Sequence, residues 1–572
     1  MIKFSFACFT LIIALSITCR VSAQMLQPAN SYELGNAPLW VKKLYGTNPN
    51  VFEIDKLYND YYTSNNFVKS FYTQEFKRWR RAVGDFIDDN GFVDHNLIQE
   101  YREIRVRKKN ANKEMKTGSW SVVGPLKVFD ESGDLKANQT NVYSITQCAG
   151  TPTTMYCGTE PGEIYKSIDG GTNWSNVSLN LGTNWGTTAI AAHPSDPNVA
   201  YAGGGDILYK TIDGGASWTI ALNSSALDPA EIFIHPGNPN IVMTTGPTGV
   251  HRTDDGGLSW VNLLNDPAYD IKSNPLNPDK LFLAMDELDD DVVDIFVSLD
   301  GGANWTRQSS GWYNSTDPDR LCRGARIAVT TADTSRVYVY LIGDSKPGDI
   351  GYIGLFRSDD GGYNWINPIG QIGSPYSDSI PNLARGSDSW AYHQGFYNCA
   401  IMASKDDPDQ IVIGGLNMWR SNDAGVTFEC VNGYQCWNYN MHVDMQDFRQ
   451  FGNEYWATTD GGIYKSSDFF FTQPTVSMSG VHGSDFWGLG SGWNVDVLVG
   501  GLYHNGNAAY YQDYAAGEFL NLGGGEAPTG YVNPGQDRRV YLSDVGGRIV
   551  PENIGDPIIG ASMGMAPNES YW

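Results

Sequence analysis

The octad Ser167-Ile168-Asp169-Gly170-Gly171-Thr172-Asn173-Trp174 decides the fold, because related octads return along most of the chain that follows it. Clear copies begin at Thr211, Thr253, Ser298 and Ser358, and two weaker copies begin at Ser421 and Ser466. Neighbouring copies lie about 45 residues apart, except for two intervals of about 60 residues. A repeat of this length is typical of a four-stranded sheet that forms one blade of a β-propeller.

The residue types in the octad predict a locked hairpin turn. The hydroxyl at its start and the carboxylate two residues later can accept backbone N–H groups of the same turn. Glycine supplies a left-handed backbone position, and the final tryptophan covers the turn. We therefore expect a structural and not a catalytic role for the octad residues, namely Asp169, Asp213, Asp255, Asp300, Asp360, Asp423, Asp468, Trp174, Trp218, Trp260, Trp305 and Trp365.

Proline-bearing turns upstream of the octads complete the repeat. They include His193-Pro194 and His235-Pro236, each followed by an alternating apolar segment, and both histidines are interpreted as turn residues. The order strand, proline turn, strand, turn, strand, octad, strand gives four antiparallel strands. We expect an all-β propeller of about eight to ten such blades over residues 118–572, preceded by a short helical segment.

The N-terminal residues predict export. Lys3 is followed by an apolar run and then by Val21-Ser22-Ala23, which suits signal-peptidase cleavage before Gln24. We therefore assign residues 1–23 to a signal peptide and expect a secreted or cell-surface protein, with no later segment long enough to span a membrane. Residues 24–117 form a helical lead-in. Within it a helix is expected near residues 51–62, and the aromatic stripe at Phe76, Trp79, Val83 and Phe86 predicts another.

Composition excludes some functions. The chain has 39 Lys+Arg against 64 Asp+Glu, a formal net charge of −25, so nucleic acid is not an expected partner. Of the cysteines beyond the leader, the pairs Cys148/Cys157 and Cys430/Cys436 could each form a local disulfide. The cysteine spacing does not suit zinc, and no cofactor is expected. The acidic run 286–291 gives only a weak suggestion of calcium.

Function in a propeller usually lies in segments that break the repeat. Three such segments are 390–399, 437–447 followed by 459–464, and 501–507 with Asp513 and 523–531. Four motifs stand in or between them, at 394–397 (Gln-Gly-Phe-Tyr), 414–419 (Gly-Gly-Leu-Asn-Met-Trp), 442–447 (His-Val-Asp-Met-Gln-Asp) and 460–464 (Asp-Gly-Gly-Ile-Tyr). With the octads, they resemble the sortilin-type Asp-box (BNR repeat) propellers of exported bacterial proteins, and are distantly similar to xyloglucan-cleaving and sialidase Asp-box hydrolases. That family often carries a C-terminal sorting domain for type IX secretion. None is apparent after Ile549, so the sequence is interpreted as possibly truncated.

The candidate catalytic residues are His442, Asp444 and Asp447. An imidazole and a carboxylate two residues apart on a strand face the same side, where they form either an acid/base pair or a structural hydrogen bond. With Asp460, the carboxylates are alternatively a hard-cation site. The candidate binding residues are His393, Gln394, Tyr397, Trp437, Asp460 and His504.

Two functions fit these observations. The first is a binding module that takes a protein, peptide or glycan through the central tunnel and the irregular loops. The alternative is a glycoside hydrolase, which needs two carboxylates about 5–10 Å apart in a cleft. Sialidases carry an Arg-Ile-Pro segment before their boxes, and none precedes Ser167, so a sialidase is disfavoured. The sequence favours binding and leaves catalysis open.

Overall fold

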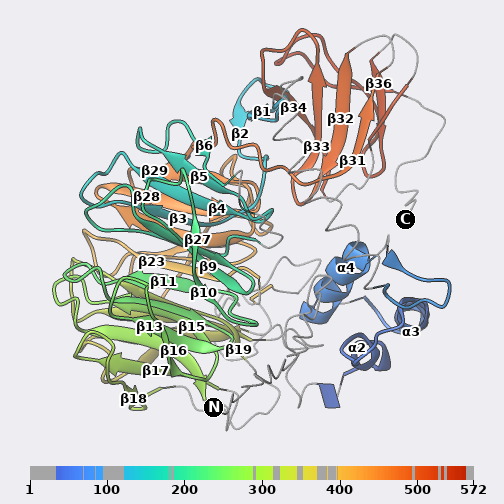
Figure 1. The fold of residues 1–572 in the computed structure, drawn as a ribbon. Helices are drawn as coiled ribbons and strands as arrows, with labels where there is room; N and C mark the ends of the chain where they lie inside the picture. The colour runs from blue at the N-terminus through green and yellow to red at the C-terminus, as the bar shows by residue number, and fades with distance from the viewer. Residues whose placement is uncertain are drawn as a thin grey trace, which may run out of the picture. The chain divides into compact units, whose positions relative to one another are not determined.

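The computed structural model describes residues 34–94 and 122–561, apart from 36, 68–69, 84–85, 179–180, 182–185, 288–291, 313–321, 344–351, 370–382, 384–393, 396, 493–495, 526–529 and 534–537. The chain divides into two compact units, Met1–Trp120 and Ser121–Trp572 (Figure 1). Within the described ranges, no helix is both long and apolar enough to cross a membrane.

The first unit is helical, as the sequence predicts. Its helices are α2 (Leu39–Leu44), α3 (Val51–Ser64) and α4 (Phe71–Val83). The side chain of Asn50 caps α3 by accepting a hydrogen bond from the Glu53 N–H at 3.0 Å. Phe76, Trp79 and Val83 are buried in one core with Trp40, which confirms the apolar stripe. Phe86 lies beyond the end of α4.

The second unit contains seven consecutive four-stranded antiparallel sheets. The first three are β3 (Val142–Gln147), β4 (Met155–Thr159), β5 (Ile164–Ser167), β6 (Ser175–Asn176); β7 (Ala189–Ala192), β8 (Ala200–Gly204), β9 (Ile207–Thr211), β10 (Thr219–Asn223); and β11 (Glu231–Ile234), β12 (Val242–Gly246), β13 (Gly249–Thr253), β14 (Val261–Leu264). The next two are β15 (Ala268–Ser273), β16 (Leu281–Glu287), β17 (Val292–Ser298), β18 (Thr306–Gln308); and β19 (Cys322–Val329), β20 (Val337–Gly343), β21 (Tyr352–Ser358), β22 (Ile366–Ile369). The last two are β23 (Ala400–Ala403), β24 (Ile411–Gly414), β25 (Met418–Ser421), β26 (Glu429–Asn432); and β27 (Met445–Phe451), β28 (Glu454–Thr459), β29 (Ile463–Ser466), β30 (Thr475–Val476).

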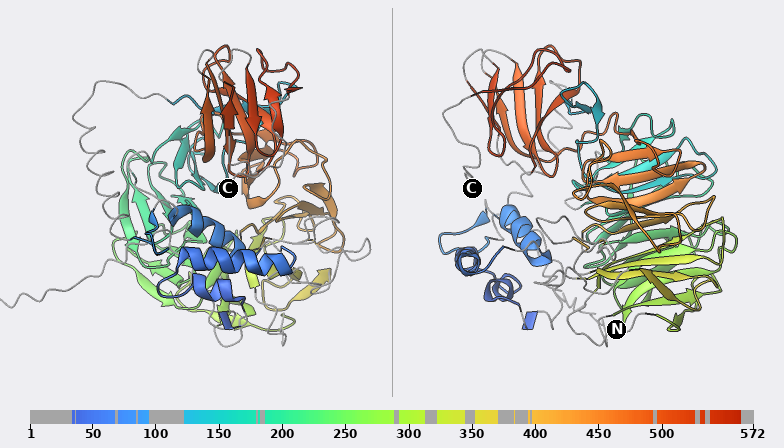
Figure 2. Two further views of the ribbon diagram at one scale, coloured as in Figure 1. Left: turned by 90° about the vertical axis from the view of Figure 1, so that its right-hand side faces the viewer. Right: turned by 180° about the vertical axis from the view of Figure 1, so that it is seen from behind.

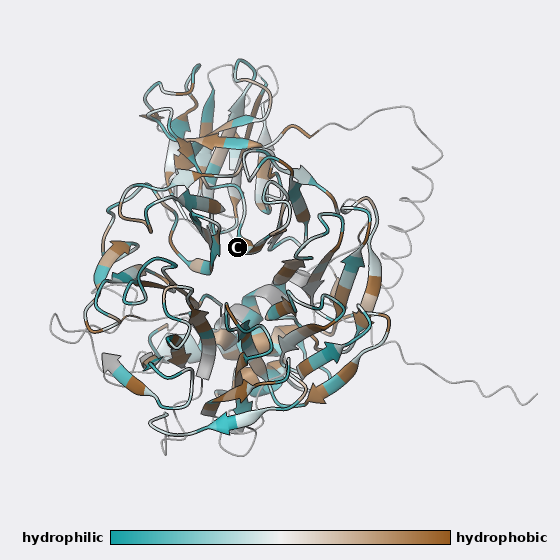
Figure 3. Cartoon of the chain, turned by 90° about the vertical axis from the view of Figure 1, so that its left-hand side faces the viewer, coloured by the Kyte–Doolittle hydropathy of each residue, from teal (hydrophilic) through white to brown (hydrophobic). Residues whose placement is uncertain are grey.

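These sheets close into a ring. The first strand of each sheet lies against the first strand of the next, and β27 of the seventh sheet lies against β3 of the first. Figure 3 shows the sheets around their common centre. The propeller is therefore confirmed, and its ring has seven blades.

Two further sheets follow the ring, which explains why it holds fewer blades than the expected eight to ten. One contains β31 (Phe486–Ser491), β32 (Val497–Leu502), β33 (Gly506–Tyr511) and β34 (Glu518–Gly523), and gains β1 (Lys127–Phe129) and β2 (Leu135–Lys136). The other contains β35 (Gly530–Val532), β36 (Arg539–Leu542), β37 (Gly546–Ile549) and β38 (Ile559–Gly560) (Figure 2). They share a core that includes Val499, Leu520 and Val540. The expected number of blades came from dividing the length of residues 118–572 by the repeat length, which counted these strands as part of the ring.

Among the described strands, each sheet of the ring is built from consecutive ones, and side chains and loops hold the first blade to the seventh. The Trp174 ring N–H donates to the carbonyl of Ser477 at 3.0 Å, and its backbone N–H donates to Ser479 at 2.8 Å. Gln139 Nε2 donates to the carbonyls of Leu126 and Met478, both at 3.0 Å. These contacts join the chain before and after the ring.

The two flanks of the ring also pair directly. Strand β1 runs parallel to β34, with Val128 opposite Phe519. The N–H groups of Leu126 and Lys127 donate to the carbonyl of Gly517 at 2.8 and 3.0 Å. The segment before the first blade is thus hydrogen-bonded to the sheet that follows the seventh blade.

Each octad forms a turn fixed by its own side chains. In the first copy, Ser167 Oγ accepts the Gly171 N–H at 2.9 Å and Asp169 Oδ1 accepts the Asn173 N–H at 2.9 Å. Gly171 has a φ of 83°, and a Cβ there would lie 2.5 Å from the ring of Trp456 in the seventh blade. The turn therefore needs glycine both for its conformation and for the close approach of the two blades.

The octad tryptophans fill the seams between blades. Trp218 belongs to the second blade and donates its ring N–H to Val177 of the first at 2.9 Å. Trp260, Trp305 and Trp365 pack into the cores that their own blades share with the preceding ones. Each octad thus serves both its own hairpin and a seam.

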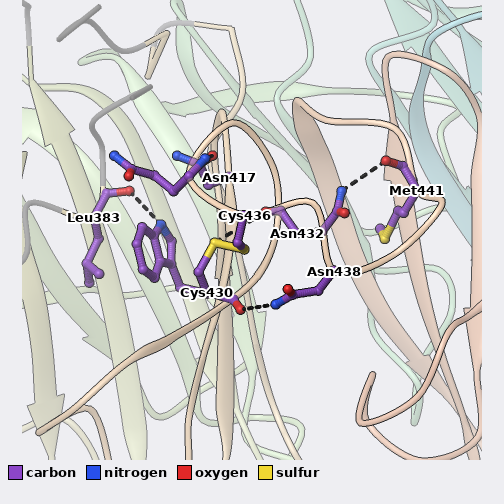
Figure 4. Close-up of a disulfide and its surroundings, with 9 residues drawn as sticks. Leu383, Asn417, Cys430, Asn432, Cys436, Asn438 and Met441 are labelled. Atoms are coloured by element: carbon purple, nitrogen blue, oxygen red, sulfur yellow. Dashed lines mark hydrogen bonds between the residues drawn. A yellow bond between two sulfur atoms is a disulfide. The ribbon is translucent and has the colours of Figure 1, made fainter. Parts of the chain in front are cut away.

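One of the two possible disulfides is present. Cys430 and Cys436 are bonded at the edge of the sixth blade (Figure 4). Asn438 Nδ2 donates to the Cys430 carbonyl at 3.0 Å and holds the next stretch of the loop. Cys148 and Cys157 are buried free thiols, so that expected bridge is absent.

Substitution of Trp174 tests the closure of the ring. Trp174→Ala should destabilise the propeller by about 3–5 kcal/mol, because it removes a buried ring together with its bond to the chain after the seventh blade. Trp365→Ala is the matched control and should cost less, because Trp365 is also 3% exposed but lies at a seam between blades consecutive in sequence. Scanning calorimetry measures both, and an equal loss for the two variants would contradict a special role for Trp174.

The octad carboxylates predict a loss of stability in acid. Hydrogen bonds from the side chain and backbone of Ser217 lower the pKa of Asp213 to about 2, and those from Asn304 do the same for Asp300. Because an unfolded aspartate titrates at about 3.9, this stabilisation is complete above that pH and is lost as pH falls towards 2. The melting temperature of the wild type should fall over this interval, whereas Asp213→Asn with Asp300→Asn should start lower and fall less steeply.

Candidate functional site

The topology places the irregular segments on one face of the ring. Strands alternate in direction, so loops after the first and third strands of a blade lie at one end and the remaining loops at the other. The octads and the proline turns share the first end, where the Gly214 N–H donates to the Asn198 carbonyl at 2.8 Å. We call the opposite end, formed by loops after second and fourth strands, the insert face.

A group of polar side chains meets on the insert face around His504. This residue lies in the tight turn between β32 and β33, outside the ring. Its Nδ1 lies 3.3 Å from Asp460 Oδ2, and its Nε2 lies 3.6 Å from Glu160 Oε2 and 3.2 Å from the Tyr397 hydroxyl. Asn141 donates to the same hydroxyl. We call these five residues the His504 cluster.

The His504 cluster joins four parts of the chain. Asn141 and Glu160 belong to the first blade, Tyr397 precedes the sixth, Asp460 belongs to the seventh, and His504 comes from the following sheet. Asp460 is fully buried and only 8% of the His504 side chain is exposed. Burial raises the pKa of Tyr397 well above its ordinary value, so its hydroxyl keeps its proton.

Amide groups surround the carboxylates next to the cluster. Asp444 Oδ1 accepts hydrogen bonds from Gln394 Nε2 and Asn398 Nδ2, both at 3.3 Å. Asp460 Oδ1 accepts one from Gln446 Nε2 at 2.6 Å. Asp444 and His504 both adopt a φ of 63°, a left-handed conformation that costs energy for residues other than glycine. The surrounding contacts therefore hold both residues in place.

The structure separates the three candidate catalytic residues. His442 and Asp444 lie in the loop before β27 and not on a strand. The ring nitrogens of His442 face carbonyl oxygens, Nδ1 that of Val443 at 2.9 Å and Nε2 that of His504 at 3.2 Å. Burial lowers the pKa of His442. The imidazole and the Asp444 carboxylate thus have different partners.

Asp447 belongs to a second group, a chain of charges inside the ring. Asp447 and Glu231 bind Arg449 at 2.6 and 2.7 Å, and Lys272 binds Glu231 at 2.8 Å and Asp270 at 2.7 Å. Arg449 is on the seventh blade and Glu231 on the third, so their ion pair crosses the ring. These side chains bridge the tunnel at this level.

The charged side chains of this group shift one another's pKa values. Burial alone would raise the pKa of Glu231, but Arg449 and Lys272 outweigh it and lower the pKa to about 2. Burial raises the pKa of Asp447 above its ordinary value, against the opposing effect of Arg449. Asp447 was selected from the His-Val-Asp-Met-Gln-Asp segment, whereas Glu231, Asp270, Lys272 and Arg449 were not selected from the sequence.

The other candidate residues lie elsewhere. Trp437 is 66% exposed in the disulfide loop, where its ring packs edge-on against Tyr434 at 5.8 Å. It is not part of the His504 cluster. His393 lies outside the described residues. Within the described ranges, no group of three His, Cys, Asp or Glu side chains is arranged to hold a metal ion.

Glu160 and Asn141 were not selected from the sequence. Glu160 lies in a short Glu-Pro-Gly turn, and Asn141 directly precedes the first blade, so neither stands in a long insert. Only the ring, which brings the first blade against the seventh, places them beside Asp460 and His504.

Comparison with known proteins gives structural likeness at low sequence identity. No protein-family model and no curated protein matches the sequence. YCF48 bound to D1 peptide aligns with 57% of this chain and 93% of its own, at 15% identity and a TM-score of 0.38. An ancestral GH74 enzyme aligns with 77% of this chain and 69% of its own, at 16% identity and a TM-score of 0.38. The GH74 enzyme of Niastella koreensis aligns with 77% and 80%, at 12% identity and a TM-score of 0.35. This likeness concerns the fold alone.

Replacing the Arg449 guanidinium tests how much the charged side chains inside the ring contribute to stability. Arg449→Met should destabilise the propeller by about 2–4 kcal/mol, because Glu231 and Asp447 then face each other without it. The cost stays below that of a fully buried pair, since 23% of the Arg449 side chain is exposed. Adding Glu231→Gln should recover part of the loss in a double-mutant cycle of urea denaturation. A purely additive result would show that the two side chains do not interact.

Proposed function

We propose that this protein is an exported binding module that takes a polypeptide or glycan on its insert face. The observation that carries the proposal is the state of the central carboxylates. Among the described residues, Glu231, Asp270 and Asp447 are paired with Arg449 or Lys272, and Asp444 accepts two amide donors. Hydrolysis of a glycoside needs a proton-donating carboxyl and a second carboxylate on an open cleft. Because these carboxylates are held by fixed partners, the arrangement favours a binding role over hydrolysis.

The tunnel charges direct the ligand to the insert face. Because the Arg449–Glu231 pair crosses the ring, a chain-like ligand would have to break it to pass through the tunnel. Beneath the insert face, the buried side chains of Gln394 and Asn398 donate to Asp444 and fix the loops, so they set the shape of the surface that a ligand would meet. The net charge of −25 favours neutral or basic ligands. Trp437 offers a second, separate contact surface.

Export is part of the proposal and rests on the leader sequence. The resemblance to sortilin-type Asp-box propellers supports the same location. N-terminal sequencing of the protein secreted by a bacterial host should begin at Gln24. A product that keeps residues 1–23 would contradict it.

Glycoside hydrolysis is the second candidate, favoured by the position of Glu160 and Asp460 on either side of His504. The full mature chain should be tested on a glycan array and a peptide array, beside a panel of chromogenic glycosides. Binding without turnover supports the proposal. Turnover that is lost in Glu160→Gln and Asp460→Asn would establish hydrolysis instead.

A pair of aspartate substitutions separates binding from stability. Asp444→Asn keeps a residue that tolerates the left-handed backbone but weakens the contacts to Gln394 and Asn398, so ligand affinity on the positive array should fall about tenfold or more. Asp300→Asn, in the fourth octad and away from the seam between the first and seventh blades, should lower the melting temperature and leave affinity unchanged. If Asp444→Asn instead unfolds the protein and retains full binding in the folded fraction, the site is wrongly placed.

A further inference from the structure

The turn between β32 and β33 binds the ring through both neutral and charged contacts. Asn505 Nδ2 donates to the Asp460 carbonyl at 2.8 Å, and His442 Nε2 lies 3.2 Å from the carbonyl of His504. The charged contacts are those of the His504 imidazole with Asp460 and Glu160. His504 is therefore one of the titratable side chains that attach the sheet after the ring to the first and seventh blades. Among the described residues, His482 before β31 also lies 3.3 Å from the Tyr165 hydroxyl, and Asp130 between β1 and β2 accepts from Asn440 at 3.3 Å.

The groups that face this imidazole respond differently to protons. On the ring they are the carboxylates of Asp460 and Glu160 and the hydroxyl of Tyr397. Within its own turn, the ring of Tyr503 lies 3.6 Å away, and Trp487 stacks on Tyr503 at 4.6 Å. His442 contacts only the backbone of His504. Histidine is the side chain whose charge ordinarily changes between pH 5 and 8, whereas carboxylates and a tyrosine hydroxyl do not. Of the two histidines at this turn, only the His504 imidazole faces the carboxylates of Asp460 and Glu160 among the described contacts.

A neutral imidazole satisfies fewer of these contacts than a charged one. It carries one N–H, which can donate to Asp460, and its other nitrogen can then accept from the Tyr397 hydroxyl. Glu160 would in that case face a nitrogen lone pair at 3.6 Å. An imidazolium donates from both nitrogens and is attracted by both carboxylates at low exposure, where charges are poorly screened.

We propose that His504 is a proton-controlled latch that holds the β31–β34 sheet against the insert face. Protons tighten the latch, and their loss at mildly alkaline pH loosens it and uncovers Asp460 and Glu160. The latch regulates access to this part of the insert face, and it does not depend on what the face binds.

Hydrogen–deuterium exchange on the full mature chain tests the latch without a ligand. Suitable probes are the N–H groups of Tyr503 and Asn505, which donate to Asp485 and Leu502, and that of Asp460, which donates to Asp444. After correction for intrinsic exchange, these amides should exchange about threefold or more faster at pH 8.0 than at pH 5.5. Equal corrected rates at the two pH values would overturn the proposal.

Three variants identify the group responsible. His504→Gln should abolish the pH dependence, and Glu160→Gln, which keeps the imidazole and its contact with Asp460, should reduce it. His251→Gln is the matched control, since His251 lies on the third blade and bonds to Thr248. It should behave as the wild type. If His504→Gln does not fold, Glu160→Gln decides the matter, because undiminished pH dependence in that variant would also overturn the proposal.

Discussion

The structure depends on joining the first blade to the seventh without a shared strand. A propeller ring closes only if its first and last blades meet, and here every described sheet of the ring is built from consecutive strands. The connection is made by Trp174, by Gln139 and by the parallel pair β1 and β34. The Arg449–Glu231 ion pair also links the seventh blade to the third across the ring. The closure thus combines hydrophobic packing, buried amide bonds and charge.

The same seam gathers the candidate site. Glu160 and Asn141 come from the blade that begins the ring, Asp460 from the blade that ends it, and His504 from the sheet beyond. The contacts that close the ring therefore set the distances between these residues. A change at the seam would reach both stability and the geometry of the His504 cluster.

The sequence was sufficient to predict the four-stranded blade but not the number of blades in the ring. The octads predict the turns because their hydroxyl, carboxylate and glycines act within eight residues of chain, where spacing determines geometry. The number of blades depends on which sheets meet, and strands β31–β38 have the same period as the ring without belonging to it. For the site, Tyr397, Asp460 and His504 were found in irregular segments, and the structure brings them together. Glu160 was missed because His504 is distant from it in sequence, and the tie across the ring was missed because Glu231 is distant from Arg449.

The pairing of β1 with β34 also bears on how the chain reaches its native state. Lys127 and Glu518 are partners across about 390 residues. Neither strand can find the other until all seven blades have been synthesised, and contacts between such distant segments form slowly. If the chain is exported from its N-terminus, as proposed, β1 would emerge long before β34. The parallel pair would then form only after the last strands had been translocated.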